Sequence, residues 1–70
     1  MIVEMMRSEG KVEVQVREYV DDPAFALLTV KRGAGEVKVF FSVLREVEEF
    51  AEAVLDACRE AREARKSKEG

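Results

Sequence analysis

The sequence predicts an α+β domain in which a four-stranded antiparallel β-meander is followed by one long amphipathic C-terminal helix. Three observations support this class. Apolar and polar residues alternate strictly over residues 11–17, turn residues divide the first 41 positions into pieces of strand length, and apolar residues recur with helical spacing after residue 42. Seventy residues have room for one domain. We expect it to span residues 1–66, with 67–70 as a frayed tail.

The first two strands are expected to form a hairpin. The segment Lys11–Arg17 carries a valine at every second position, which is typical of a strand with one buried face. A two-residue turn at Glu9-Gly10 would join this strand to another over residues 1–8, and it would pair Ser8 with Lys11.

Two more strands follow, at residues 25–32 and 36–41. Asp21-Asp22-Pro23-Ala24 is a turn signal, because proline presets a bend and aspartate bonds to nearby backbone. Gly33-Ala34-Gly35 separates the third strand from the fourth. Across these two loops we expect Val20 to pair with Phe25, and Arg32 to pair with Glu36.

The C-terminal third of the chain is predicted to be a helix over residues 43–66. Ser42 is the expected N-cap, since its hydroxyl can accept a hydrogen bond from an amide of the first turn. Acidic residues gather in the first half and basic residues towards the end, which matches the helix dipole. A helix of this length spans about 36 Å, whereas a strand of seven or eight residues spans about 25 Å. The turns from Arg59 to Lys66 should therefore project beyond the sheet. The apolar positions are Val43, Val47, Phe50, Val54, Cys58 and Ala61, flanked by Leu44, Ala51 and Leu55.

The expected register sorts the strand residues onto two faces of the sheet. The face predicted to take the helix holds Val3, Met5, Val12, Val14, Val16, Val20, Phe25, Leu27, Val37, Val39 and Phe41. The opposite, outer face is mixed and holds Ile2, Glu4, Met6, Glu13, Gln15, Arg17, Tyr19, Ala26, Leu28, Val30, Arg32, Glu36, Lys38 and Phe40.

Several function classes are disfavoured by composition. The chain has no histidine and a single cysteine, Cys58. An intrachain disulfide, a cysteine-histidine zinc site and a Cys–His nucleophile are therefore ruled out, and we expect no enzyme activity, no cofactor and no metal. Self-association is the remaining way to supplement so small a core.

The charge pattern bears on partners and on location. Charged residues are 39% of the chain but the net charge is only −3, so any attraction for nucleic acid has to be local. Many Glu, Lys and Arg residues with few amides resemble the composition of thermophile proteins. No apolar run has membrane-spanning length and the start does not resemble a signal peptide, so we expect a cytoplasmic protein with no membrane partner.

Two hypotheses compete for the outer face. Aromatic and basic residues on an open sheet, here Tyr19 and Phe40 with Arg17, Arg32 and Lys38, are typical of proteins that bind single-stranded nucleic acid. Alternatively, the apolar residues form an interface with a second copy or another protein. The interface candidates are Leu28, Val30 and Phe40 on the sheet and Ala57 and Ala61 on the helix overhang.

One stretch resembles a known family. The segment Gly35-Glu-Val-Lys-Val-Phe-Phe-Ser-Val-Leu-Arg-Glu-Val-Glu-Glu-Phe50 is similar to the last strand, capping serine and helix start of a repeat of the Whirly/Pur group, which has four meander strands and then a helix. The resemblance implies a domain that pairs and presents basic and aromatic residues to single strands. By position, the matching residues are Lys11, Arg17, Tyr19, Arg32, Lys38 and Phe40.

The function expected from the sequence is a small homodimeric module that binds single-stranded DNA or RNA. The alternative is a non-enzymatic structural or protein-interaction subunit that uses the outer face and the helix overhang for assembly.

Overall fold

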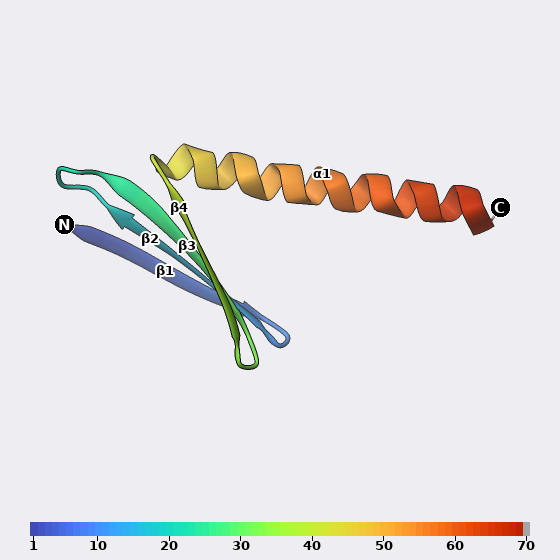
Figure 1. The fold of residues 1–70 in the computed structure, drawn as a ribbon, viewed down its shortest axis with the longest axis horizontal. Coiled ribbons are helices and arrows are strands. Elements are labelled where there is room, and N and C mark those ends of the chain that lie inside the picture. Colours follow the sequence, from blue (N-terminus) through green and yellow to red (C-terminus); the bar gives the residue numbers. More distant parts are fainter. Residues whose placement is uncertain (70) are drawn as a thin grey trace.

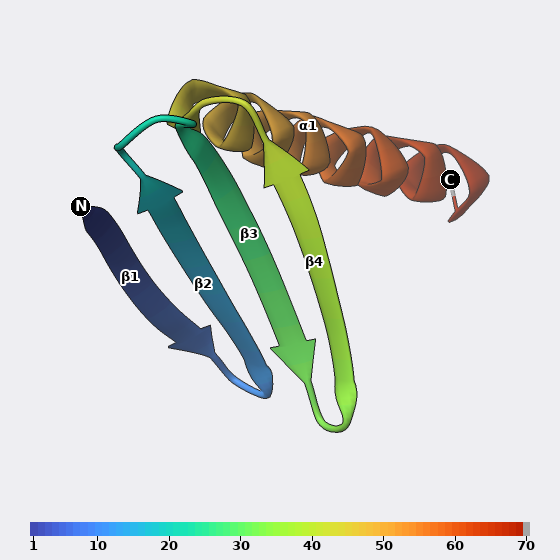
Figure 2. The same cartoon turned by 60° about the vertical axis from the view of Figure 1, so that its left-hand side comes forward.

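A computed structural model describes residues 1–69 and confirms the predicted α+β class (Figure 1). Strands β1 (Ile2–Glu9), β2 (Val12–Tyr19), β3 (Phe25–Arg32) and β4 (Gly35–Phe41) precede one helix, α1 (Leu44–Glu69). The strands form one antiparallel sheet in the order β1-β2-β3-β4, with α1 against one face (Figure 2). The helix runs three residues beyond the predicted end at Lys66, and Gly70 of the predicted tail lies outside the described residues.

Two of the three strand connections are turns of two residues that place glycine first. Gly10-Lys11 joins β1 to β2, and Gly33-Ala34 joins β3 to β4. The two glycines have φ values of 62° and 59°, while no other residue type has positive φ within residues 1–69. Positive φ at the first central position alone is typical of a type II′ turn, which favours glycine there. The predicted turns at Glu9-Gly10 and Gly33-Ala34-Gly35 are therefore wrong by one residue.

The strand register differs from the prediction at all three strand pairs. Ser8 pairs with Glu13 rather than Lys11, a shift of two residues that leaves both faces of β1 and β2 as predicted. Tyr19, not Val20, pairs with Phe25. The amide of Val20 instead donates to the carbonyl oxygen of Met1 at 3.0 Å, beyond the last pair of β1 with β2. Arg32 pairs with Gly35 rather than with Glu36.

The shifts between β2 and β3 and between β3 and β4 are each of one residue, and they exchange the two faces of β3. A one-residue slip exchanges the faces of a strand. The slip between β2 and β3 moves each β3 side chain to the face opposite to the predicted one. The slip between β3 and β4 compensates, so the β4 side chains lie on their predicted faces. The placement of Ala26, Leu28, Val30 and Arg32 on the outer face was therefore wrong, because they share the helix side of the sheet with Val14 and Val16. Phe25 and Leu27 lie on the opposite face.

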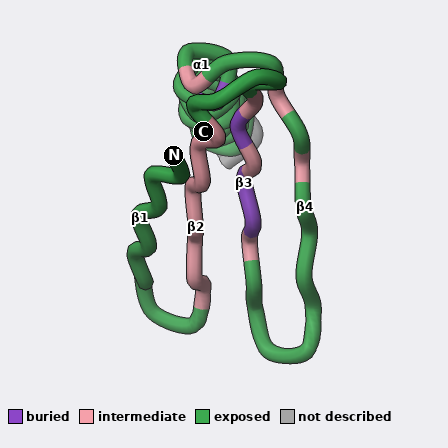
Figure 3. Tube along the Cα trace, turned by 90° about the vertical axis from the view of Figure 1, so that its left-hand side faces the viewer, coloured by how far each residue is buried: buried purple, intermediate pink, exposed green. Residues whose placement is uncertain are grey.

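The hydrophobic core lies between the start of α1 and the middle of the sheet (Figure 3). Ala26, Leu28 and Val47 are its buried members. The rings of Phe41 and Phe50 lie 5.7 Å apart and close one side of it. Partly buried residues pack around this centre, namely Val14, Val16, Val30, Phe41 and Leu44.

The start of α1 is held by a first-turn acid. The backbone amide of Ser42 donates to the Glu46 carboxylate at 2.9 Å. The bond resembles one half of a capping box but spans four residues instead of three. In the predicted cap the Ser42 hydroxyl accepts a hydrogen bond from a first-turn amide, whereas in the structure the Ser42 amide donates to a first-turn side chain. A carboxylate here also interacts favourably with the helix dipole.

The far half of α1 projects away from the sheet (Figure 1). Twenty-six residues span about 39 Å, and the molecule measures 53 × 26 × 15 Å. The predicted overhang is present, and Ala57 and Ala61 lie exposed on the helix. Within residues 1–69, no helix combines the length and apolar character needed to cross a bilayer.

Candidate nucleic-acid interface

The candidate site lies on the sheet face opposite α1, called the open face below. Strand pairing arranges its side chains in four rows across the sheet. The rows are Ile2, Tyr19 and Phe25; Glu4, Arg17, Leu27 and Phe40; Met6, Gln15, Thr29 and Lys38; and Ser8, Glu13, Lys31 and Glu36.

Three aromatic side chains form a continuous group at one end of the open face. Tyr19 and Phe25 are directly opposed on neighbouring strands, and their rings stack with centroids 4.2 Å apart and planes 18° apart. The Phe40 ring is 5.9 Å from Phe25 and tilted by 46°. Phe40 is 68% exposed. The first two rings therefore support each other, and the third offers a free surface on which a planar group can stack.

Arg17 holds a polar network beside the aromatic group. Its Nη1 donates to the Tyr19 hydroxyl at 3.2 Å, and its Nη2 lies 3.3 Å from a Glu4 carboxylate oxygen. The Gln15 side-chain amide also donates to Glu4. The pKa of Arg17 is raised above its ordinary value, first by the hydrogen bond with Tyr19 and then by Glu4. These contacts hold the guanidinium in position beside the aromatic group.

The remaining charges on the open face are balanced overall. Lys31 lies 3.7 Å from a Glu36 oxygen in a partly exposed ion pair. Lys38 has no ion-pair partner among the described residues. It sits two positions before Phe40 on β4, so the two side chains share one face, and their Cα atoms lie roughly 7 Å apart along the strand.

The structure brings together four of the six predicted nucleic-acid residues: Arg17, Tyr19, Lys38 and Phe40. Lys11 lies in the exposed β1–β2 turn, at the end of β2 away from Tyr19. About 25 Å of strand separates the two. Arg32 lies at the end of β3 on the helix side, so its placement on the predicted face was wrong.

The predicted sheet interface needs a similar correction. Leu28 is only 7% exposed and belongs to the core beneath α1. Val30 packs against the same core. Both were expected on the outer face, and the reversal of β3 is the physical reason for the difference. Of the predicted interface residues on the sheet, Phe40 alone remains on the open face.

Phe25 is the site residue that sequence reasoning missed. It was assigned to the helix side because Val20 was expected to pair with it. An available signal was the preference of aromatic residues for cross-strand pairing, which favours Tyr19 over Val20 as the partner of Phe25. That pairing would have placed β3 correctly.

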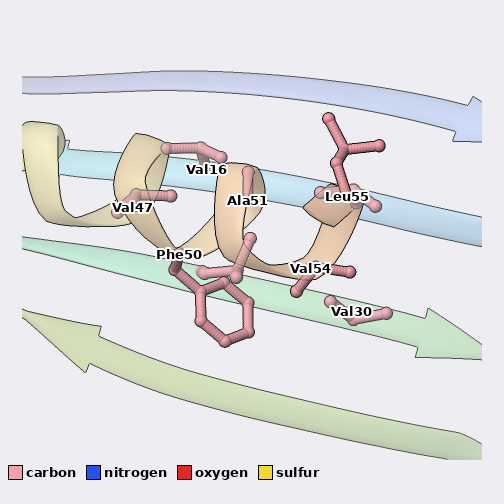
Figure 4. Close-up of a pocket in the computed structure, with 9 residues that line it drawn as sticks. Val16, Val30, Val47, Phe50, Ala51, Val54 and Leu55 are labelled. Atoms are coloured by element: carbon pink, nitrogen blue, oxygen red, sulfur yellow. The ribbon is translucent and has the colours of Figure 1, made fainter. Parts of the chain in front are cut away.

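A second feature, the apolar groove, opens between α1 and the sheet on the other side of the molecule (Figure 4). Its volume is about 390 Å³. The groove is lined by Val14, Val16, Leu28, Val30, Val47, Phe50, Ala51, Val54 and Leu55. It contains no charged or hydrogen-bonding side chain, so its chemistry is that of hydrophobic packing.

Comparisons with protein-family models, with curated proteins and with solved structures gave no match to this chain. The chemical possibilities of the site therefore come from its own geometry. The open face offers stacking at Phe40, a free cation at Lys38, and an arginine whose carboxylate partner is partly exposed.

Proposed function

We propose that this protein is a non-enzymatic module that binds single-stranded nucleic acid on its open face and acts as a homodimer. The observation that carries the proposal is the aromatic group of Tyr19, Phe25 and Phe40 beside Arg17 and Lys38. Stacking on an aromatic ring combined with phosphate contacts is the usual way in which single strands are bound without reading sequence.

In the proposed mechanism, a base stacks on the exposed Phe40 ring while Tyr19 and Phe25 keep the neighbouring surface rigid. Lys38 contacts a phosphate directly. Arg17 contributes a second phosphate contact by exchanging its Glu4 partner for the phosphate, and its bond to Tyr19 keeps the guanidinium in position during the exchange. The resemblance of the element order to a Whirly/Pur repeat supports the same assignment.

The proposal is tested by fluorescence anisotropy of a labelled single-stranded oligonucleotide titrated with the protein over a series of salt concentrations. Phe40→Ala removes a stacking platform worth about 1–3 kcal/mol per base. We therefore expect affinity to fall by roughly 5- to 150-fold. Phe40→Leu keeps the apolar character and loses the ring, so it separates stacking from general hydrophobic contact.

Lys38→Ala should reduce the slope of log affinity against log salt by about one. Lys66→Ala is the matched control, since it removes the same charge from the far end of α1. The proposal would be contradicted if the unaltered protein did not bind the oligonucleotide at low salt. It would also be contradicted if Lys38→Ala and Lys66→Ala lowered the affinity and the salt slope equally.

A protein-interaction role is the second candidate, and the charge balance of the open face favours it. Arg17 and Lys31 are already paired with acids, which lowers the field available to attract phosphates. In that case Phe40 would anchor a protein partner by hydrophobic contact, and Phe40→Leu, which keeps the apolar side chain, would weaken the partner's binding much less than Phe40→Ala.

A further inference from the structure

The folded chain leaves an unusual amount of apolar surface uncovered around the apolar groove. Within residues 1–67, only three hydrophobic residues are buried, and no large side chain is less than 2% exposed. Meanwhile six large apolar residues on the helix side of the molecule are between 43% and 71% exposed, and those on α1 line the groove. Three come from the sheet and three from the helix: Val3, Met5 and Val37, and Phe50, Val54 and Leu55.

The size of this surface matches the requirement of a stable dimer. A fully exposed apolar side chain of this size presents on the order of 150 Å², so six half-exposed ones leave roughly 450–500 Å² per chain. A standard interface buries about 800 Å² per partner, of which about two-thirds is apolar in homodimers. The uncovered surface therefore supplies nearly all the apolar area that a homodimer interface uses.

The shape of the surface points to a second copy as its occupant. One wall of the groove is a convex helix stripe, and the other is a sheet surface (Figure 4). Two copies related by a two-fold axis can each insert the helix stripe of Phe50, Val54 and Leu55 against the other's sheet. Such an interface is isologous and needs no further partner. It lies on the side of the sheet opposite the open face.

We infer that the apolar groove is the homodimer interface, filled by the helix stripe of a second copy. The inference deepens the homodimer part of the proposed function, and it does not require nucleic acid. Because the open face stays uncovered in this arrangement, a dimer would present two such faces to solvent.

The test is sedimentation equilibrium of the full chain, without oligonucleotide, from about 1 to 100 µM. Leu55→Asp places a charge in the groove, and Met6→Asp is a matched control because Met6 is also 54% exposed but lies on the open face. We expect the unaltered chain and Met6→Asp to have dimer mass, and Leu55→Asp to weaken association at least 100-fold. Far-UV circular dichroism reports whether each variant is folded.

A second measurement covers the case in which Leu55→Asp does not fold alone. If folding is coupled to dimerisation, the Tm of the unaltered chain rises with protein concentration, and Leu55→Ala reduces that dependence while Met6→Ala does not. A monomer mass at 100 µM for the unaltered chain overturns the inference. Dissociation by Met6→Asp with Leu55→Asp unaffected also overturns it, and assigns the interface to the open face.

Discussion

The reversal of β3 makes a direct prediction about two adjacent leucines. Leu28 is 7% exposed and packs in the core with Ala26 and Val47. Leu27 is half-buried on the open face, where it pairs with Phe40. Leu→Ala substitutions in cores cost about 2–5 kcal/mol. Leu28 borders the open groove, where neighbours can relax, so we expect Leu28→Ala to lower the free energy of unfolding by about 2–3 kcal/mol.

The matched variant Leu27→Ala removes the same atoms one position earlier. Because its side chain is only partly buried, the expected loss is about 1 kcal/mol or less. Urea unfolding followed by far-UV circular dichroism measures both, at one protein concentration so that any dimerisation affects the variants equally. A domain of this size is stabilised by roughly 4–10 kcal/mol, so the larger loss removes a substantial part of the total.

The comparison discriminates between the two registers. In the register expected from the sequence, Leu27 would face the helix and Leu28 would be on the outer face. A greater loss for Leu27→Ala than for Leu28→Ala would refute the reversed β3 and the core described above. Equal losses would show that both faces of β3 are covered to a similar extent.

Three further predictions follow from the turns, the cap and the open face. Gly33→Ala should lower unfolding free energy by about 1–2 kcal/mol, since φ is 59° there, whereas Ala34→Gly should cost less in the same urea assay. Glu46→Ala should lower the free energy of unfolding by about 0.5–1 kcal/mol, because the bond to the Ser42 amide is lost. An equal decrease for Glu48→Ala would contradict this role of Glu46. Glu4→Gln should free Arg17 and tighten oligonucleotide binding roughly threefold at low salt; Glu9→Gln, on the other face of β1, should change it less.

The architecture was predictable because its signals are local. Valine at alternate positions of β2 defines a strand with one buried face, and helical spacing after Ser42 defines α1. Glycine and proline between these segments limit the lengths of the strands. Since the helix is longer than the strands, its overhang also followed from residue counts alone.

The candidate site was predictable only in part, because it depends on which face each strand presents. Arg17 and Tyr19 share one face of β2, and Lys38 and Phe40 share one face of β4, regardless of which face of β3 is buried. Strand periodicity alone therefore grouped these residues within each strand. Phe25 and Arg32 were misplaced because both lie on β3.

The chain sequence thus determined the elements, their order and which face of β2 and of α1 is apolar. The tertiary structure decided which face of β3 is buried. Phe25, Ala26, Leu27 and Leu28 are all apolar, so alternation does not distinguish the buried face of this strand. The pairing of Tyr19 with Phe25 and the glycine-first turn at Gly33 define one register. These are contacts and backbone conformations of the folded chain, and they place Leu28 in the core and Phe25 beside Tyr19.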